Sequence, residues 1–139
     1  MTQIGIVGTG AWATTLGILL ARAGHTTVLW SRSESRAQEL TTDRVNNRSV
    51  PGVDFPDSMR VTTSTTESLF DSKLVIVAVP SVTLRDNIRQ IADSISFDSK
   101  IVCATKGIEI ESGKRMSQVI IEELPGFGSD QVGVLSGPN

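Results

Sequence analysis

A short apolar run that ends in a glycine-rich turn constrains this chain more than any other feature of its sequence. Ile4 to Val7 is rich in β-branched residues, which predicts a strand buried on both faces. Six residues follow in the pattern GxGxxA: Gly8, Thr9, Gly10, Ala11, Trp12 and Ala13. Apolar residues then recur at helical spacing, and Gly24 supplies a stop signal. The apolar positions of this expected helix are Trp12, Leu16, Leu19, Leu20 and Ala23.

The small residues of this turn suit a loop that holds a phosphate. Gly8 permits the tight turn, and Gly10 lets the backbone approach a ligand without a Cβ in the way. Ala13 is small enough for the helix to pack close to the strand. The start of the helix offers free N–H groups and a partial positive charge to phosphates. The alternative is a glycine-rich strand–helix turn that binds no ligand.

The chain beyond this turn continues to alternate between strand-like runs and amphipathic stretches. Further strands are expected over Thr26–Trp30, Arg60–Thr63, Leu74–Val79, Ile101–Ala104 and Gln131–Leu135. Helices are expected from Ser33 to about Leu40, from Ser81 to Ile95 and from Met116 to Leu124, with Ser33 and Ser81 as N-caps. Residues 41–59 are expected to form a long polar connection.

Strands that alternate with helices imply parallel βαβ units with right-handed crossovers. We therefore predict an α/β fold, namely a Rossmann-type, doubly wound, mostly parallel sheet with helices on both faces. No repeat or linker divides the chain, so residues 1–139 are expected to form one dinucleotide-binding domain. The chain stops directly after a strand-like run, which we take to indicate a truncation of a longer protein.

Composition narrows the classes of function. The chain carries 13 basic and 15 acidic residues, and this near balance argues against nucleic acid or a membrane surface as a partner. Cys103 is the only cysteine and is most simply a small buried hydrophobe. No signal peptide or membrane-length apolar run is present in the sequence, so a cytoplasmic location is expected. No metal site is expected.

The residues after the second predicted strand bear on the choice of cofactor. NAD-specific domains commonly place Asp or Glu there to bind the ribose 2′-hydroxyl, whereas this chain has Trp30, Ser31, Arg32 and Ser33. An arginine suits a ribose 2′-phosphate, so we predict that NADPH binds better than NADH, with NAD still possible. The alternative is that Arg32 is a solvated surface charge and that Glu34 takes the ribose.

Two more segments lie at the carboxyl ends of predicted strands, where ligands bind in such sheets. Pro80 ends one strand, and without an N–H donor it would let backbone pass close to the nicotinamide ribose. Lys106 follows another strand and would reach toward an anionic substrate or polarise its carbonyl group. The alternatives are a plain strand terminator at Pro80 and an ordinary surface lysine at Lys106.

Six segments together resemble, in order and spacing, the N-terminal half of bacterial-type NAD(P)-dependent glycerol-3-phosphate dehydrogenase. They are the opening GxGxW, Trp30-Ser31-Arg32, Asn46-Asn47-Arg48 with Pro51-Gly52, Val77 to Ser81, Thr105 to Glu109, and Ser136-Gly137-Pro138. Three departures are mild: Ala11 and Ala13 stand where the family often has other small or polar residues, and Ser49 stands where it often has an aromatic one.

The resemblance implies reversible hydride transfer between NAD(P)H and dihydroxyacetone phosphate, giving sn-glycerol 3-phosphate for phospholipid synthesis. It implies that Lys106 contacts both cofactor and substrate and that Gly137 lies at the substrate. The residues expected to bind cofactor are Gly8, Gly10, Ala11, Trp12, Arg32, Pro80 and Lys106. It also implies that the catalytic lysine lies in a helical C-terminal domain absent from this chain, which alone should not turn over substrate; the full-length enzyme could be a homodimer.

Two rival readings remain open from the sequence. One is the front half of another two-domain dehydrogenase, of the 6-phosphogluconate or ketopantoate type. The Thr105-Lys106-Gly107 segment and the loop around Asn46 and Pro51 speak against it. The other is a stand-alone nucleotide-sensing module that carries out no chemistry.

Overall fold

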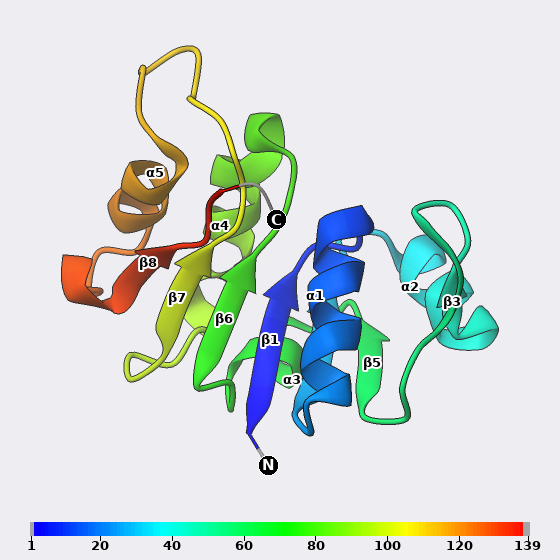
Figure 1. Ribbon diagram of the computed structural model, residues 1–139. Helices are drawn as coiled ribbons and strands as arrows, with labels where there is room; N and C mark the ends of the chain where they lie inside the picture. The colour runs from blue at the N-terminus through cyan, green and yellow to red at the C-terminus, as the bar shows by residue number, and fades with distance from the viewer. Residues whose placement is uncertain (1, 138–139) are drawn as a thin grey trace.

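A six-stranded sheet forms the centre of the computed structural model, which describes residues 2–137. All the strand pairs of this sheet are parallel, in the order β5-β2-β1-β6-β7-β8 (Figure 1). The strands are β1 (Gln3–Val7), β2 (Thr26–Trp30), β5 (Met59–Thr62), β6 (Leu74–Val77), β7 (Lys100–Cys103) and β8 (Val132–Val134). The chain starts at the centre and winds outward in both directions, which confirms the predicted doubly wound fold.

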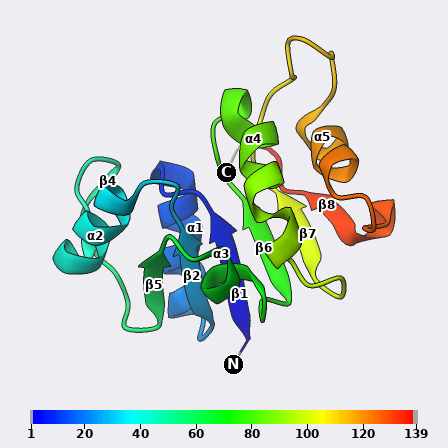
Figure 2. The ribbon, with the colours of Figure 1, turned by 180° about the vertical axis from the view of Figure 1, so that it is seen from behind.

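Helices cover both faces of the sheet, as predicted. Helix α1 lies in front of the sheet in Figure 1, and Figure 2 shows α3 and α4 on the opposite face. The helices are α1 (Ala11–Arg22), α2 (Glu34–Asp43), α3 (Thr65–Leu69), α4 (Leu84–Ile91) and α5 (Met116–Glu123), with 3-10 turns η1 (Ser81–Thr83), η2 (Ala92–Ser94) and η3 (Ser129–Gln131). No helix of residues 2–137 is long and apolar enough to cross a membrane.

Small residues let α1 pack closely against the sheet. Ala13, Gly17 and Ala21 recur every fourth residue and are all buried. A Cβ on Gly17 would lie 2.9 Å from the Leu29 side chain, so a larger residue would push the helix away. The apolar face predicted from the sequence is therefore partly wrong, because Leu19 is 55% exposed and Ala23 is exposed as well.

The predicted N-cap at Ser33 and the predicted stop at Gly24 are confirmed, and the predicted N-cap at Ser81 is wrong. The Ser33 hydroxyl accepts a hydrogen bond from the Arg36 N–H (3.2 Å) and caps α2, and Gly24 follows α1 with a φ of +94°. Ser81 does not cap a helix. Its segment begins as the 3-10 turn η1, because the Pro80 carbonyl accepts from the Thr83 N–H at 3.1 Å.

The prediction that residues 41–59 form a polar connection is wrong. The segment contains an antiparallel hairpin of β3 (Val45–Asn46) and β4 (Val50–Asp54), which pairs apart from the main sheet. Helix α3 was not predicted either, and β6 ends at Val77, two residues before the expected end. Residues 78–80 are therefore loop, and they lie at the carboxyl edge of the sheet.

Candidate functional site

The loops that follow β1, β2, β6 and β7 meet at the carboxyl edge of the sheet and line two adjoining pockets. The β7-side pocket, about 470 Å³, is lined by Gly10, Ala11, Trp12, Ala78, Val79, Pro80, Ser81, Ala104, Thr105 and Lys106. The β2-side pocket, about 510 Å³, includes Gly8, Thr9, Gly10, Ser31, Arg32, Ser33, Arg36, Arg48 and Ser49 in its lining, together with Ala78, Val79 and Pro80. The pockets meet where β1 lies beside β6, the point at which the strand order reverses.

The two glycines of the opening turn serve different purposes. Gly8 has a φ of +122°, and a Cβ there would lie 2.4 Å from the carbonyl oxygen of Ala78. Gly10 has an ordinary φ of −75°, and a Cβ there would meet no atom of the described residues within 4 Å. Neither the backbone conformation nor the packing around residue 10 requires a glycine there. The absence of a side chain at Gly10 instead leaves open space for a ligand at the junction of the pockets.

The first turn of α1 presents uncapped N–H groups at this junction. Gly10 is the N-cap residue of α1, so it has no side chain to bond them, and the first turn contains no acidic residue. Ala11 and Trp12 begin the helix and line the β7-side pocket. The positive end of a twelve-residue helix therefore faces open space, which suits a phosphate group.

Arginines surround the β2-side pocket. Arg32 is exposed and has no hydrogen bond or ion pair to any residue that the structure describes. Arg36 and Arg48 also line the pocket, and each lies 3.0 Å from the same carboxylate oxygen of Glu39. Glu34 does not line the pocket, so the alternative in which it takes the ribose finds no support in this arrangement. The pocket offers guanidinium groups to an anion.

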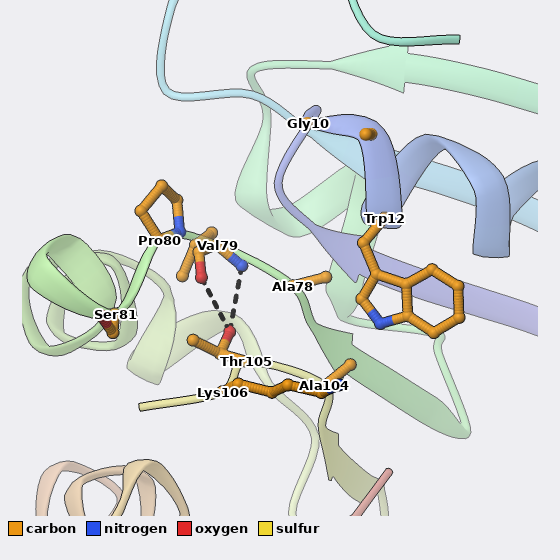
Figure 3. Close-up of a pocket in the computed structure, with 10 residues that line it drawn as sticks. Gly10, Trp12, Ala78, Val79, Pro80, Ser81, Ala104, Thr105 and Lys106 are labelled. Carbon is orange, nitrogen blue, oxygen red and sulfur yellow. Dashed lines mark hydrogen bonds between the residues drawn. The ribbon is translucent and has the colours of Figure 1, made fainter. Parts of the chain in front are cut away.

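The loops after β6 and β7 are tied together by one side chain. The Thr105 hydroxyl donates to the carbonyl of Val79 (2.9 Å) and accepts from its N–H (3.2 Å), as the dashed lines in Figure 3 show. In the same view the Trp12 indole and Pro80 lie on opposite sides of the pocket. The Lys106 ammonium group donates to the carbonyl of Gly137 at 3.0 Å. The structure thus brings Lys106 and Gly137 together; Pro138 lies outside the described residues.

An ion-pair cluster holds the segment after Lys106 against α4. Arg85 donates to both carboxylate oxygens of Glu109 at 2.7 Å, and it also contacts Glu123. Hydrogen bonds from Arg85 and then Ser112 lower the pKa of Glu109 to about 2. These charges satisfy one another, so the cluster supports the loop rather than a reaction.

Cys103 is buried within β7, as its sequence context predicts. Burial raises the pKa of its thiol, which keeps the group protonated at neutral pH and unsuited to nucleophilic chemistry. No cluster of potential metal ligands occurs among residues 2–137.

Comparison with known proteins places this architecture in a family. A model of the NAD-dependent glycerol-3-phosphate dehydrogenase N-terminus matches residues 3–139. A glycerol-3-phosphate dehydrogenase [NAD(P)+] of Chlorobium phaeobacteroides is 43% identical over 99% of this chain and 41% of its own length. The chain thus spans about two fifths of that relative.

Solved structures agree with the match. The crystal structure of a glycerol-3-phosphate dehydrogenase from Coxiella burnetii superposes with a TM-score of 0.84 at 29% identity, over 96% of this chain and 39% of that one. A ketopantoate reductase from Ralstonia eutropha gives a TM-score of 0.71 at 16% identity over 96% of this chain and 40% of that one, which shows a common fold only. The chain belongs to the family of NAD-dependent glycerol-3-phosphate dehydrogenase N-terminal domains.

Proposed function

We propose that this chain is the cofactor-binding half of an oxidoreductase that interconverts dihydroxyacetone phosphate and sn-glycerol 3-phosphate with NAD(P)H. The observation that carries the proposal is the pair of adjoining pockets at the switch point of the sheet, with the uncapped start of α1 at their junction. A dinucleotide has two nucleoside halves joined by a pyrophosphate, and this site has the corresponding three parts.

Each part of the site takes one part of the cofactor in this proposal. Gly8 and Gly10 shape the turn, and the N–H groups at Ala11 and Trp12 bind the pyrophosphate. Arg32 binds the ribose 2′-phosphate in the β2-side pocket, which favours NADPH over NADH. The nicotinamide half occupies the β7-side pocket, whose remaining walls include Pro80 and Lys106.

The reduced nicotinamide, when bound, supplies the hydride. Lys106 then has two tasks in the proposal: it faces the cofactor and places a positive charge beside the anionic substrate. A fixed cation favours the negative charge that develops on a carbonyl oxygen during reduction. Gly137, bonded to Lys106 through its carbonyl, lies at the same place and is assigned to the substrate.

The proposal assigns the catalytic lysine to a second domain, in the part of the relatives that this chain does not match. Residues 1–139 alone are therefore expected to bind cofactor without turning over substrate. The proposal also includes a cytoplasmic location, a role in glycerophospholipid synthesis, a homodimeric full-length enzyme, and neither nucleic acid nor membrane as a partner.

Calorimetric titration with NADPH and NADH tests the proposal. Arg32→Ala removes a charge-assisted hydrogen bond that contributes about 1.5–3 kcal/mol. We therefore expect it to weaken the binding of NADPH roughly 10- to 150-fold and the binding of NADH far less. Arg22→Ala is the matched control, because Arg22 is an exposed arginine at the opposite end of α1. Equal losses for both cofactors would remove Arg32 from the 2′-phosphate site, and a wild-type chain that binds neither cofactor would refute the proposed function.

A further inference from the structure

The side chain of Asn46 is a fully buried polar group beside the candidate site. It is 0% exposed, although it belongs to the short hairpin at the edge of the molecule. Its amide nitrogen donates to the carbonyl of Thr9 (3.0 Å) and to the hydroxyl of Thr14 (2.8 Å). Its amide oxygen accepts from the Arg36 guanidinium. Both N–H groups and the oxygen are therefore bonded, as burial of an amide requires.

These partners lie on three different elements. Thr9 belongs to the glycine-rich turn, Thr14 to α1 and Arg36 to α2. The hairpin itself is fixed at its base, where the Arg44 guanidinium donates to the carbonyls of Met59 and Pro56, each at 2.8 Å. Asn46 thus connects a fixed hairpin to the turn that the proposed function assigns to the pyrophosphate.

The turn needs such a restraint because of its sequence. Thr9 lies between Gly8 and Gly10, and glycine populates more backbone conformations than any other residue. Gly8 is held by its N–H, which donates to the Trp30 carbonyl at 3.0 Å, and Gly10 by its carbonyl, which accepts from the Thr14 N–H at 3.0 Å. The peptide group between these two points carries the Thr9 carbonyl, and Asn46 is bonded to its oxygen.

We propose that Asn46 is a positioning residue for cofactor binding: by holding the Thr9 carbonyl, it fixes the direction in which the N–H groups that follow point. The inference rests on the proposed function, because it concerns how the same turn binds pyrophosphate. It assigns Asn46 no contact with the cofactor. NADPH and NADH share the pyrophosphate, so a loss of this restraint affects both equally, in contrast to a loss of Arg32.

The test is Asn46→Asp, which keeps the size of the side chain and an acceptor for Arg36 but cannot donate to Thr9. We expect NADPH and NADH both to bind about tenfold more weakly, as for the loss of one well-placed hydrogen bond. Adenosine 2′-monophosphate, which has the ribose phosphate but no pyrophosphate, should keep its affinity for the uncharged variant Asn46→Ser within about twofold. Thr41→Val is the matched control: it removes a hydrogen bond on α2, from the Thr41 hydroxyl to the carbonyl of Val61 at 3.3 Å, outside both pockets, and should leave both dinucleotide affinities within about twofold.

Three outcomes overturn the inference. The first is that Asn46→Asp binds both dinucleotides as tightly as the wild type does. The second is that Asn46→Ser loses as much affinity for adenosine 2′-monophosphate as for the dinucleotides, which would indicate general damage to the fold. The third is an equal loss of dinucleotide affinity for Thr41→Val and Asn46→Asp. Asn46→Ser removes the amide without adding a charge, and it is measured in parallel. It should also weaken the binding of both dinucleotides about tenfold, so it tests the inference even if Asn46→Asp does not fold. A wild-type chain that binds neither dinucleotide refutes the proposed function itself.

Discussion

Replacing Gly10 by aspartate should stabilise the fold and at the same time weaken cofactor binding by about two orders of magnitude. Gly10 occupies the N-cap position of α1 with an extended backbone, at φ −75° and ψ −172°, which aspartate adopts readily. A Cβ there would meet none of the described residues within 4 Å. An aspartate would cap the free N–H groups of the first turn and complement the helix dipole.

The two effects have opposite signs and can be sized. A better cap, a favourable dipole interaction and a less flexible unfolded chain together give about 1 kcal/mol of added stability. That is about 3 °C in Tm for a domain of this size. A carboxylate about 5 Å from a phosphate costs about 3 kcal/mol at an effective dielectric constant of about 20, or about 150-fold in affinity.

Thermal unfolding and calorimetric titration with NADPH measure the two effects separately. Gly10→Asn is the matched control, because asparagine caps helices as well as aspartate does but carries no charge. Its affinity loss should be smaller than that of Gly10→Asp, and the difference isolates the charge. A Gly10→Asp variant that binds NADPH as well as the wild type would refute the pyrophosphate assignment. A variant that unfolds several degrees earlier would refute the reasoning about Gly10.

Three further predictions follow from the surroundings of the site. Gly8→Ala should cost about 2–3 kcal/mol in denaturant unfolding, because φ is +122° and the new Cβ would lie 2.4 Å from the Ala78 carbonyl oxygen. The pKa of Glu109 is lowered to about 2 by Arg85, so the stability that its charge contributes is present above its usual pKa of 4.5 and is lost as the pH falls toward 2. The stability gap between wild type and Glu109→Gln should therefore shrink from pH 6 to pH 2; a constant gap would exclude this ion pair as its source. Cys103 should react with iodoacetamide only on unfolding, and rapid alkylation of the native chain would contradict its burial.

Local patterns were sufficient to predict the main sheet and which segments lie at its carboxyl edge. A β-branched run, a glycine turn and an apolar helical period all occur within a short stretch of sequence, about fifteen residues long. Residues close together in the sequence were therefore enough to predict β1, the turn and α1. Arg32 and Lys106 could be placed at the carboxyl edge because each immediately follows a strand of a parallel sheet. Their position in the fold follows from chain order, although their roles stay predictions.

The hairpin and its buried asparagine could not be predicted, because their structure depends on distant partners. Residues 41–59 are polar and contain two prolines, which is typical of a loop. Asn46 is buried because Thr9 and Arg36 satisfy its amide, and neither contact has a signature in the local sequence. For a similar reason Leu19 was misplaced: helical spacing favours the large apolar residues, whereas close packing selects the small residue Gly17.

At the carboxyl edge of the sheet, buried or half-buried side chains of one segment bind the backbone groups of another and so fix the loops to one another. Asn46 holds the carbonyl of Thr9, and Thr105 holds both backbone groups of Val79. The groups that would choose between ligands, Arg32 and Lys106, are by contrast exposed side chains on these loops. Because the backbone framework does not depend on those two side chains, we expect that either can change without moving the turn to which the proposed function assigns the pyrophosphate.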